Sequence, residues 1–125
     1  MDVQKVQFFT NRPEVRLQLM EELPRRFGNL CVSSSVVDNV EINQDSANKG
    51  KALLALAAHL GLDRKQTVAF GDGLNDLPML TKAGIGVAMG NAFDEVKAQV
   101  KYITAHNDED GVAKAINKFV FGEEE

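Results

Sequence analysis

The sequence predicts an α/β chain in which a short β-α-β-β segment precedes a parallel sheet with flanking helices. Two patterns support this prediction. Between residues 3 and 42, β-rich stretches flank a helix-forming one, and from residue 48 onward short apolar stretches alternate with helix-forming ones. Strands and helices that alternate in this way are typical of a parallel sheet. The 125 residues, 44% of them hydrophobic, suffice for one compact unit or two very small ones.

The first segment is predicted to begin with a strand, because residues 3–9 alternate in polarity and are rich in β-forming side chains. Pro13 fits the first turn of a helix, and the apolar residues after it recur at helical spacing. Two further strands are predicted at residues 30–37 and 40–42, separated by a turn at residues 38–39. The expected order is therefore β-α-β-β.

The second segment is predicted to alternate between helices and buried strands. Helices are predicted at residues 52–60, 77–83, 93–100 and 112–121, and strands at residues 67–70, 85–89 and 102–103. Met79, Leu80 and Met89 are expected in the core. The boundary between the two segments, near residues 43–48, follows only from the change in pattern.

Composition narrows the classes of function. The net charge of -4 and the pI near 5.2 give no basic face for a nucleic-acid backbone, so no nucleic-acid partner is expected. Cys31 is the single cysteine, which excludes a disulfide framework or a thiolate zinc site and fits the cytoplasm. The longest apolar run, Ala52 to Leu60, is interrupted by His59 and is too short to span a bilayer. A soluble protein without a membrane partner is expected.

The strongest chemical signal is the segment from Gly71 to Asp76, which follows an apolar strand with a glycine and two acids. Ligands of open parallel sheets gather at the carboxyl ends of strands, and an acid there can approach a small hard cation. Asp72 is the natural magnesium ligand, Asp76 is expected to coordinate directly or through a metal-bound water, and Asn75 presents an amide. The alternative is that both acids are ordinary turn and cap residues.

Four segments, in this order, favour the functional interpretation: Asn48–Lys51, Gly71–Asp76, Gly86–Ala92 and Asn107–Gly111. Together they resemble the lysine-glycine helix start, GDxxND loop, GVAMGNA strand exit and NxEDG segment of the Cof-type haloacid dehalogenase (HAD)-like phosphatases. The resemblance implies a Rossmann-like core into which an α+β cap is inserted. Residues 1–43 resemble the last part of that cap, and residues 44–125 the carboxyl-terminal half of the core.

The resemblance also implies roles for individual residues. Lys49 corresponds to the family's phosphate-binding lysine, Asp72 to the magnesium (Mg²⁺) ligand, and Asn75 to a phosphate contact. Asp76 corresponds to a residue that supports the metal site, either by binding the metal directly or by holding the groups that bind it. The alternative for Lys49 is a solvated lysine at a helix start, which is the interpretation expected for Lys51.

One family motif is missing. Members attack phosphorus with the first aspartate of a DxDGT segment at the end of a strand and use the second as acid and base, and the sequence upstream of Lys49 has no such segment. Residues 108–111 have similar letters but precede a helix, so they are expected to be first-turn and cap residues. Asn91 is expected either to stabilise the loop or to face the cap, and His59 and His106 have no matching role. No catalytic residue is therefore assigned within this chain.

Three functions remain open at the level of sequence. The chain is a fragment or mis-started frame of a phosphatase for small phosphomonoesters such as sugar phosphates, with Met1 an internal methionine, and is inactive alone. Otherwise it is one chain of a split phosphatase, or a phosphate- and metal-binding module without turnover. The expected partners are a small phosphorylated metabolite and either a second copy of the chain or a complementing chain that carries DxDGT.

Overall fold

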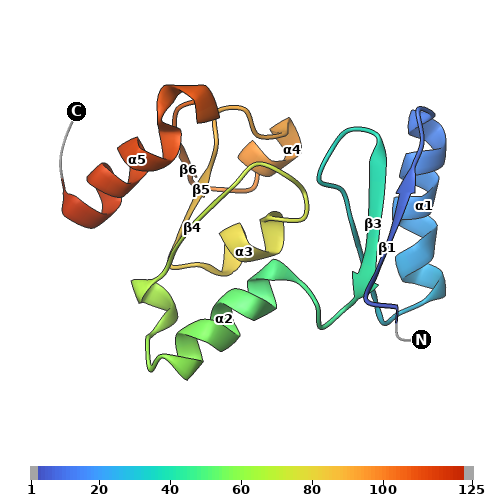
Figure 1. Cartoon of the computed structure of the whole chain (residues 1–125), viewed down its shortest axis with the longest axis horizontal. Helices are drawn as coiled ribbons and strands as arrows, with labels where there is room; N and C mark the ends of the chain where they lie inside the picture. The colour runs from blue at the N-terminus through green and yellow to red at the C-terminus, as the bar shows by residue number, and fades with distance from the viewer. Residues whose placement is uncertain (1–2, 123–125) are drawn as a thin grey trace.

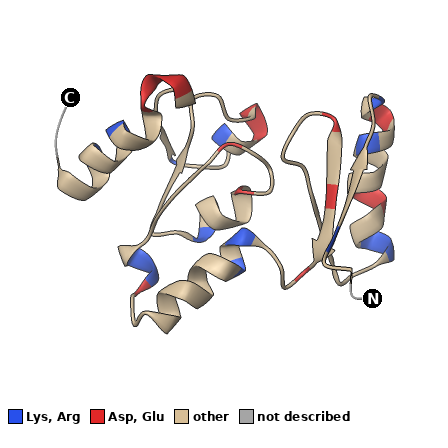
Figure 2. Ribbon diagram, in the orientation of Figure 1, with Lys and Arg blue, Asp and Glu red and all other residues tan. Residues whose placement is uncertain are grey.

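A computed structural model describes residues 3–122, which form two three-stranded sheets (Figure 1). One sheet is antiparallel, with strand order β1-β3-β2, and the other is parallel, with strand order β4-β5-β6. The α/β class and the change of pattern between the two segments are therefore confirmed. Lys and Arg are interspersed with Asp and Glu over both sheets and their helices (Figure 2).

The antiparallel sheet and one helix make up the first segment. Its elements are β1 (Lys5–Phe9), α1 (Pro13–Arg26), β2 (Leu30–Ser33) and β3 (Asn39–Gln44). β3 lies between β1 and β2, and α1 lies along one face of the sheet (Figure 1). Because successive strand residues point to opposite faces, one face of this sheet packs on α1 and the other is turned toward the second segment. The predicted β-α-β-β order is confirmed.

The connection between β2 and β3 differs from the prediction. The strand predicted to reach residue 37 ends at Ser33, and Asn39, predicted in the turn, is the first residue of β3. The reason is the buried Asn39 side chain, whose Oδ1 accepts hydrogen bonds from the backbone N–H groups of Ser35 (3.1 Å) and Val36 (3.2 Å). A side chain that binds these donors takes the place of a strand partner, so the segment forms a loop.

The parallel sheet and its helices make up the second segment. Its strands and α-helices are α2 (Lys49–His59), β4 (Val68–Gly71), α3 (Leu77–Lys82), β5 (Ile85–Ala88), α4 (Asp94–Lys97), β6 (Tyr102–Ile103) and α5 (Gly111–Ile116). Short 3-10 turns at Arg64–Gln66 and Asn107–Glu109 and a π-helical stretch at Asn117–Phe121 complete it. Helices α2 and α3 pack on each other, and α5 lies on the other side of the sheet (Figure 1).

Helix α4 is shorter than the predicted helix at residues 93–100. Phe93 stays outside it, with its backbone N–H donating to the carbonyl of Asp72 at 3.1 Å. At the other end the backbone tightens, since the N–H of Gln99 donates to Val96 only three residues back, at 3.1 Å. Specific backbone contacts therefore determine both ends of α4, and the helix propensities of these residues do not predict such contacts.

The core of the second segment is built mostly from small side chains. It contains Ala69, Leu80, Ala83, Ala88, Ala92 and Val96, all at most 6% exposed. The predicted burial of Leu80 and Met89 is confirmed, and Met79 packs against this cluster. Alanines at these positions let the helices approach the sheet closely, which fixes the carboxyl ends of the strands relative to the loops that follow them.

One edge of the parallel sheet is open. β4 lies at this edge, and no strand pairs with its other side within residues 3–122. The backbone groups on that side of β4 are therefore available to a further strand. None of the helices in the described part of the chain is long and apolar enough to cross a membrane.

Candidate functional site

The predicted site residues lie at the carboxyl end of β4, where the strand ends at Gly71 and α3 begins after Asp76. Asp72 is exposed and follows β4 directly, whereas Asp76 is only 6% exposed. The parallel strand β5 ends at the same edge of the sheet, so the loop after β5 comes close to both acids.

Asp76 is an acceptor for three donors. Its Oδ1 is paired with the ammonium group of Lys49, and its Oδ2 accepts from the backbone N–H groups of Asp72 (3.0 Å) and Gly73 (3.1 Å). Its side chain makes no capping bond to α3. Asp76 thus stands at the N-cap position of α3 without capping the helix through its side chain, and its carboxylate instead points back and holds the loop that carries Asp72.

The charge of Asp76 follows from these contacts. Burial raises the pKa of this carboxyl, but the hydrogen bonds from Lys49 and from the backbone N–H groups of Asp72 and Gly73 outweigh it, so the pKa lies below its usual value. Asp76 is thus an ionised, fully engaged carboxylate at neutral pH, and Lys49 is its counter-ion.

Two glycines make this arrangement sterically possible. A Cβ at Gly71 would lie 2.8 Å from Cγ of Asp76, so only glycine lets the carboxylate turn back toward the strand. A Cβ at Gly50 would lie 2.6 Å from the carbonyl carbon of Pro78, so glycine lets the start of α2 approach α3. That approach brings Lys49 to Asp76.

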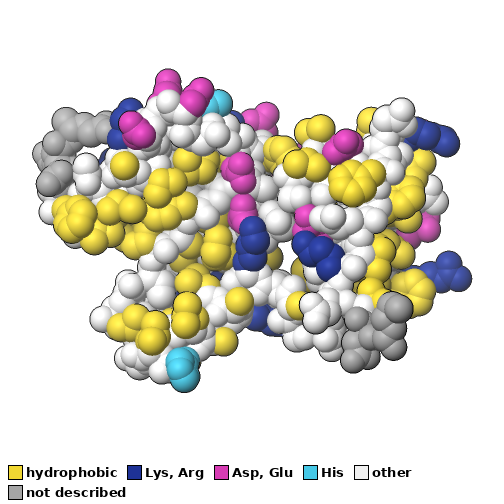
Figure 3. Space-filling view, viewed as in Figure 1, with side chains coloured by type: hydrophobic (Ala, Val, Ile, Leu, Met, Phe, Trp, Pro, Cys, Tyr) yellow, Lys and Arg dark blue, Asp and Glu magenta, His cyan; other side chains and the backbone are white. Residues whose placement is uncertain are grey.

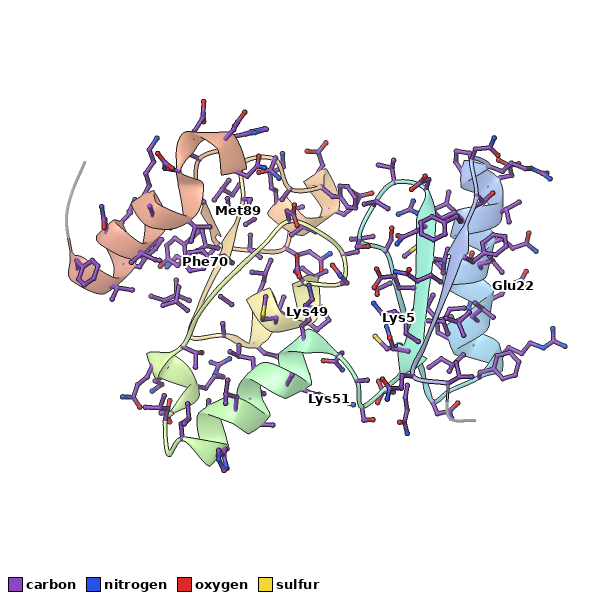
Figure 4. All side chains as sticks on the ribbon, viewed as in Figure 1. Lys5, Glu22, Lys49, Lys51, Phe70 and Met89 are labelled. Atoms are coloured by element: carbon purple, nitrogen blue, oxygen red, sulfur yellow. The ribbon has the colours of Figure 1, made fainter. Side chains whose placement is uncertain are left out.

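Lys49 is the first residue of α2 and its side chain is half exposed. Asn48 caps the helix, with its Oδ1 accepting from the N–H of Lys51 at 2.9 Å. The Lys51 side chain pairs instead with the exposed Asp45 at 2.6 Å. The helix therefore directs one lysine to the site and the other to the surface, as its spacing predicts (Figure 4).

Asp72 has one engaged and one open carboxylate oxygen. Its Oδ2 accepts from the side-chain amide of Asn91 at 3.2 Å, while Oδ1 has no hydrogen bond within residues 3–122. Asn91 in turn accepts from the backbone N–H of Asn107 at 3.0 Å. Of the two roles left open for Asn91, these contacts match the first: it joins the loop after β5 to Asp72 and to the segment before α5.

The donor set fits Mg²⁺ in part. No group of three or more His, Cys, Asp or Glu side chains gathers within the described part of the chain. The chain offers the open oxygen of Asp72, while Asp76 is already occupied by Lys49 and two N–H groups. Mg²⁺ is commonly held by one or two carboxylates plus waters and substrate oxygens, so Asp72 alone supplies the smaller of these two protein sets.

Asn75 lies at a pocket between the two sheets, where acidic and basic side chains meet at a hollow in the surface (Figure 3). The pocket has a volume of about 120 Å³ and is lined by Lys5, Cys31, Ser33, Glu41, Asn43, Ala47, Asn48, Lys49, Asn75 and Pro78. The two predicted phosphate contacts, Lys49 and Asn75, therefore share a cavity. The backbone N–H of Asn75 also donates to Ser34 at 3.3 Å, which ties the loop after β4 to the loop after β2.

Lys5 and Glu41, which also line this pocket, were not among the residues singled out from the sequence. The available signal was the alternation of the strands: Lys5 and Gln7 in β1, and Asn39, Glu41 and Asn43 in β3, are polar at every second position. Such a pattern predicts one polar face per strand.

The acids at residues 108–110 have the predicted surroundings. Asp108 and Glu109 lie in the 3-10 turn before α5, and Asp110 immediately precedes that helix with a left-handed φ of 58°. The ring of His106 contacts Asp108 at 3.1 Å, on the surface. These are turn residues rather than a nucleophile at the tip of a buried strand.

The sequence as a whole matches proteins of known class. A family described as haloacid dehalogenase-like hydrolase matches residues 1–116. The chain is 45% identical over 107 residues to a 5-amino-6-(5-phospho-D-ribitylamino)uracil phosphatase of Bacillus subtilis, which covers 86% of the chain and 43% of that protein. It is 42% identical over 90 residues to an HMP-PP phosphatase of Citrobacter koseri, covering 72% of the chain and 32% of that protein.

The fold matches solved structures of the same class. A haloacid dehalogenase-like hydrolase from Bacillus subtilis superposes with a TM-score of 0.82 at 36% identity, over 93% of this chain and 40% of that one. A HAD subclass IIB sugar phosphatase superposes with a TM-score of 0.82 at 31% identity, over 96% of this chain and 44% of that one. The chain thus spans less than half the length of each of these proteins. By sequence and by fold, it belongs to the Cof-type haloacid dehalogenase-like hydrolases.

Proposed function

We propose that this chain supplies the phosphate- and metal-binding part of a magnesium-dependent phosphatase for small phosphomonoesters. The observation that carries the proposal is the ion pair of Lys49 with the buried Asp76, beside the open carboxylate oxygen of Asp72. All three lie where ligands of open parallel sheets bind. The named activities of the two relatives support a small phosphorylated metabolite as the substrate.

Lys49 and Asn75 would bind the phosphoryl oxygens. An ammonium group has three N–H donors, and Asp76 takes one, so Lys49 keeps donors for a phosphate while its position is fixed. Asn75 lines the same cavity and adds a neutral amide. A fixed cation beside the phosphoryl group stabilises the negative charge that its oxygens carry during transfer.

Asp72 would hold the metal through its open oxygen, and Asn91 would keep the carboxylate oriented from the other oxygen. Asp76 would act from behind, because it accepts from the backbone N–H of Asp72 and so fixes the loop. When bound, Mg²⁺ would neutralise charge on the phosphoryl oxygens. A single carboxylate from this chain leaves room for a second one from elsewhere.

The nucleophile would come from outside these 125 residues, since they contain no DxDGT segment at the end of a strand. The free edge of β4 suits this role, because a further parallel strand can pair there. A strand in that place would bring the acid at its own carboxyl end next to Asp72. Residues 1–43 would then be part of a cap over the site, and residues 44–125 part of the core.

A second candidate function is a phosphate-binding module without turnover. The same missing nucleophile favours it. Both candidates predict binding of phosphate by this chain, and they differ only in whether a second polypeptide restores hydrolysis.

Thermal unfolding of the full chain with inorganic phosphate and with Mg²⁺ tests the proposal. A ligand that binds only the folded chain raises its Tm. We expect each addition to raise the Tm of the wild-type chain, Lys49→Met to abolish the shift by phosphate, and Asp72→Asn to abolish the shift by Mg²⁺. Lys51→Met, which changes a lysine two residues away that is paired with Asp45, is the control and should keep both shifts.

Each shift is measured against the same variant without ligand, so that a general loss of stability does not count. Phosphate shifts of equal size in the wild-type chain and in Lys49→Met would contradict the assigned role of Lys49. The same samples should not hydrolyse p-nitrophenyl phosphate with Mg²⁺. Hydrolysis by the chain alone that disappears in Asp72→Asn would show that the nucleophile lies within these residues.

A further inference from the structure

The face of the antiparallel sheet that is turned away from α1 is polar. In the pairing of β1 with β3, Lys5 lies opposite Asn43 and Gln7 opposite Glu41, and in the pairing of β2 with β3, Ser33 lies opposite Glu41. These residues share one face because side chains alternate along each strand. The other face carries the apolar residues between them in sequence, Val6, Phe8, Val32, Val40 and Ile42.

Glu41 is the buried centre of this polar face, at 4% exposed. Its carboxylate accepts from Ser35 Oγ (2.5 Å), Gln7 Nε2 (3.1 Å), Asn39 Nδ2 (3.3 Å) and Lys5 Nζ (2.9 Å). Burial raises the pKa of this carboxyl, but the hydrogen bonds from Ser35, Lys5 and Gln7 outweigh it and hold the pKa at about 2. Glu41 is therefore a fixed negative charge, although the phosphate chemistry proposed above makes no use of it.

Lys5 is the charged donor to Glu41, and its side chain remains 46% exposed. One N–H of its ammonium group is given to Glu41, which leaves two donors for a ligand. A hydroxyl or carbonyl oxygen can accept a hydrogen bond from these donors.

Lys5 and Lys49 lie on opposite sides of the space between the two sheets (Figure 4). Both line the pocket of about 120 Å³, together with Glu41 and Asn75. A phosphomonoester whose phosphate is held by Lys49 has room for the rest of the molecule along this pocket. The wall of the pocket that belongs to the antiparallel sheet contains Lys5, Glu41 and Asn43.

We propose that Lys5 is a substrate-recognition residue whose ammonium group binds an oxygen of the alcohol part of the phosphomonoester, and that the buried Glu41 is the residue that positions it. This inference rests on the proposed function, because it needs the phosphate to be bound by Lys49. It assigns two residues of the first segment: Lys5 as the donor to the substrate and Glu41 as the residue that holds Lys5 in place.

Direct binding to the full chain tests the inference, with ribitol 5-phosphate and inorganic phosphate as the two probes. We expect Lys5→Met to weaken binding of ribitol 5-phosphate about tenfold, as for a lost charge-assisted hydrogen bond, and to leave the affinity for inorganic phosphate unchanged. Lys49→Met should weaken binding of both probes. Lys51→Met, which removes the lysine of a comparable but surface-exposed ion pair, should change neither affinity.

The role of Glu41 is tested with Glu41→Gln, which keeps the shape of the side chain and loses its charge. The affinity for ribitol 5-phosphate divided by the affinity for inorganic phosphate should be lower in Glu41→Gln than in the wild-type chain. The double variant Lys5→Met/Glu41→Gln should show the same ratio as Lys5→Met alone. A role in folding alone would lower the Tm and leave the ratio unchanged. Lys5→Arg, which keeps a donor, should retain most of the preference.

The outcomes separate the two proposals. Phosphate binding that depends on Lys49, combined with a ratio of affinities that Lys5→Met does not change, would overturn the inference and leave the proposed function intact. Binding of neither probe by the wild-type chain would overturn both.

Discussion

At the scale of single residues, the site requires a glycine. A side chain at Gly71 would collide with Asp76, since a Cβ there would lie 2.8 Å from its Cγ. Gly71→Ala should therefore displace the carboxylate and lower the free energy of unfolding by about 1–3 kcal/mol, measured by urea unfolding. Gly28→Ala is the matched control, because a Cβ at Gly28 meets nothing within 4 Å. Equal losses in the two variants would show that the close approach at Gly71 has no energetic weight.

The buried Glu41 makes a prediction about pH. Its pKa is about 2 in the folded chain against 4.5 for an unperturbed glutamate, so its contribution to stability is complete above about pH 4.5 and is lost as the pH falls toward 2. The shift corresponds to a contribution on the order of 3 kcal/mol. Glu41→Gln should therefore be less stable than the wild-type chain at neutral pH.

The difference in Tm between Glu41→Gln and the wild-type chain should shrink as the pH is lowered from about 6 to about 3. Thermal unfolding followed by circular dichroism at several pH values gives this difference directly. A difference that stays constant over the whole range would contradict an ionised Glu41 in the folded chain.

Which single residues could be assigned from the sequence depended on their surroundings along the chain. Lys49, Asp72, Asn75 and Asp76 fall in short motifs at the ends of a strand and a helix, where position predicts function. The pair of Lys5 and Glu41 is invisible in this way, because its partners are 36 positions apart and meet only through the pairing of β1 with β3. The alternation of polar residues along β1 and β3 shows that one face of the sheet is polar. It does not show which part of the chain lies opposite that face.

At the scale of elements, helix α2 positions Lys49 beside Asp76. Asn48 closes its first turn with a side-chain hydrogen bond, so Asn48→Ala should lower the free energy of unfolding by about 1 kcal/mol, measured by urea unfolding. Asn48→Asp keeps the side-chain acceptor, so its free energy of unfolding should return to that of the wild-type chain. Asn117→Ala, at an exposed position that begins the π-helical stretch, is the control and should cost less. A loss that Asn48→Asp fails to restore would point to a cause other than the cap.

The elements themselves were largely predictable from the period of their apolar residues. All six strands and the main helices were predicted, because apolar spacing and glycines mark them locally. The misplaced end of β2 and the short α4 follow from specific contacts instead: the Asn39 side chain holds the loop after β2, and the N–H of Phe93 binds Asp72 before α4 begins. Neither contact has a signal in local propensity.

At the scale of the whole molecule, the proposed function depends on how the two sheets face each other. The loop after β2 contacts the loop after β4 through Ser34 and Asn75, and the pocket between the sheets takes residues from both. The sequence predicted the two segments but not this pocket, since it depends on packing between distant parts of the chain. The free edge of β4 is the second feature at this scale, and it leads to the most direct test.

The central claim is that this chain holds the phosphate and metal half of a phosphatase site. It is tested by mixing the chain with a second polypeptide. This polypeptide is the part of the Bacillus subtilis 5-amino-6-(5-phospho-D-ribitylamino)uracil phosphatase that the chain does not match. Hydrolysis of p-nitrophenyl phosphate with Mg²⁺ is then measured. We expect hydrolysis only in the mixture, its loss with Lys49→Met or Asp72→Asn, and its retention with Lys51→Met. A mixture in which the two polypeptides bind each other and no hydrolysis occurs, or in which Lys49→Met and Asp72→Asn are as active as the wild-type chain, would contradict the account.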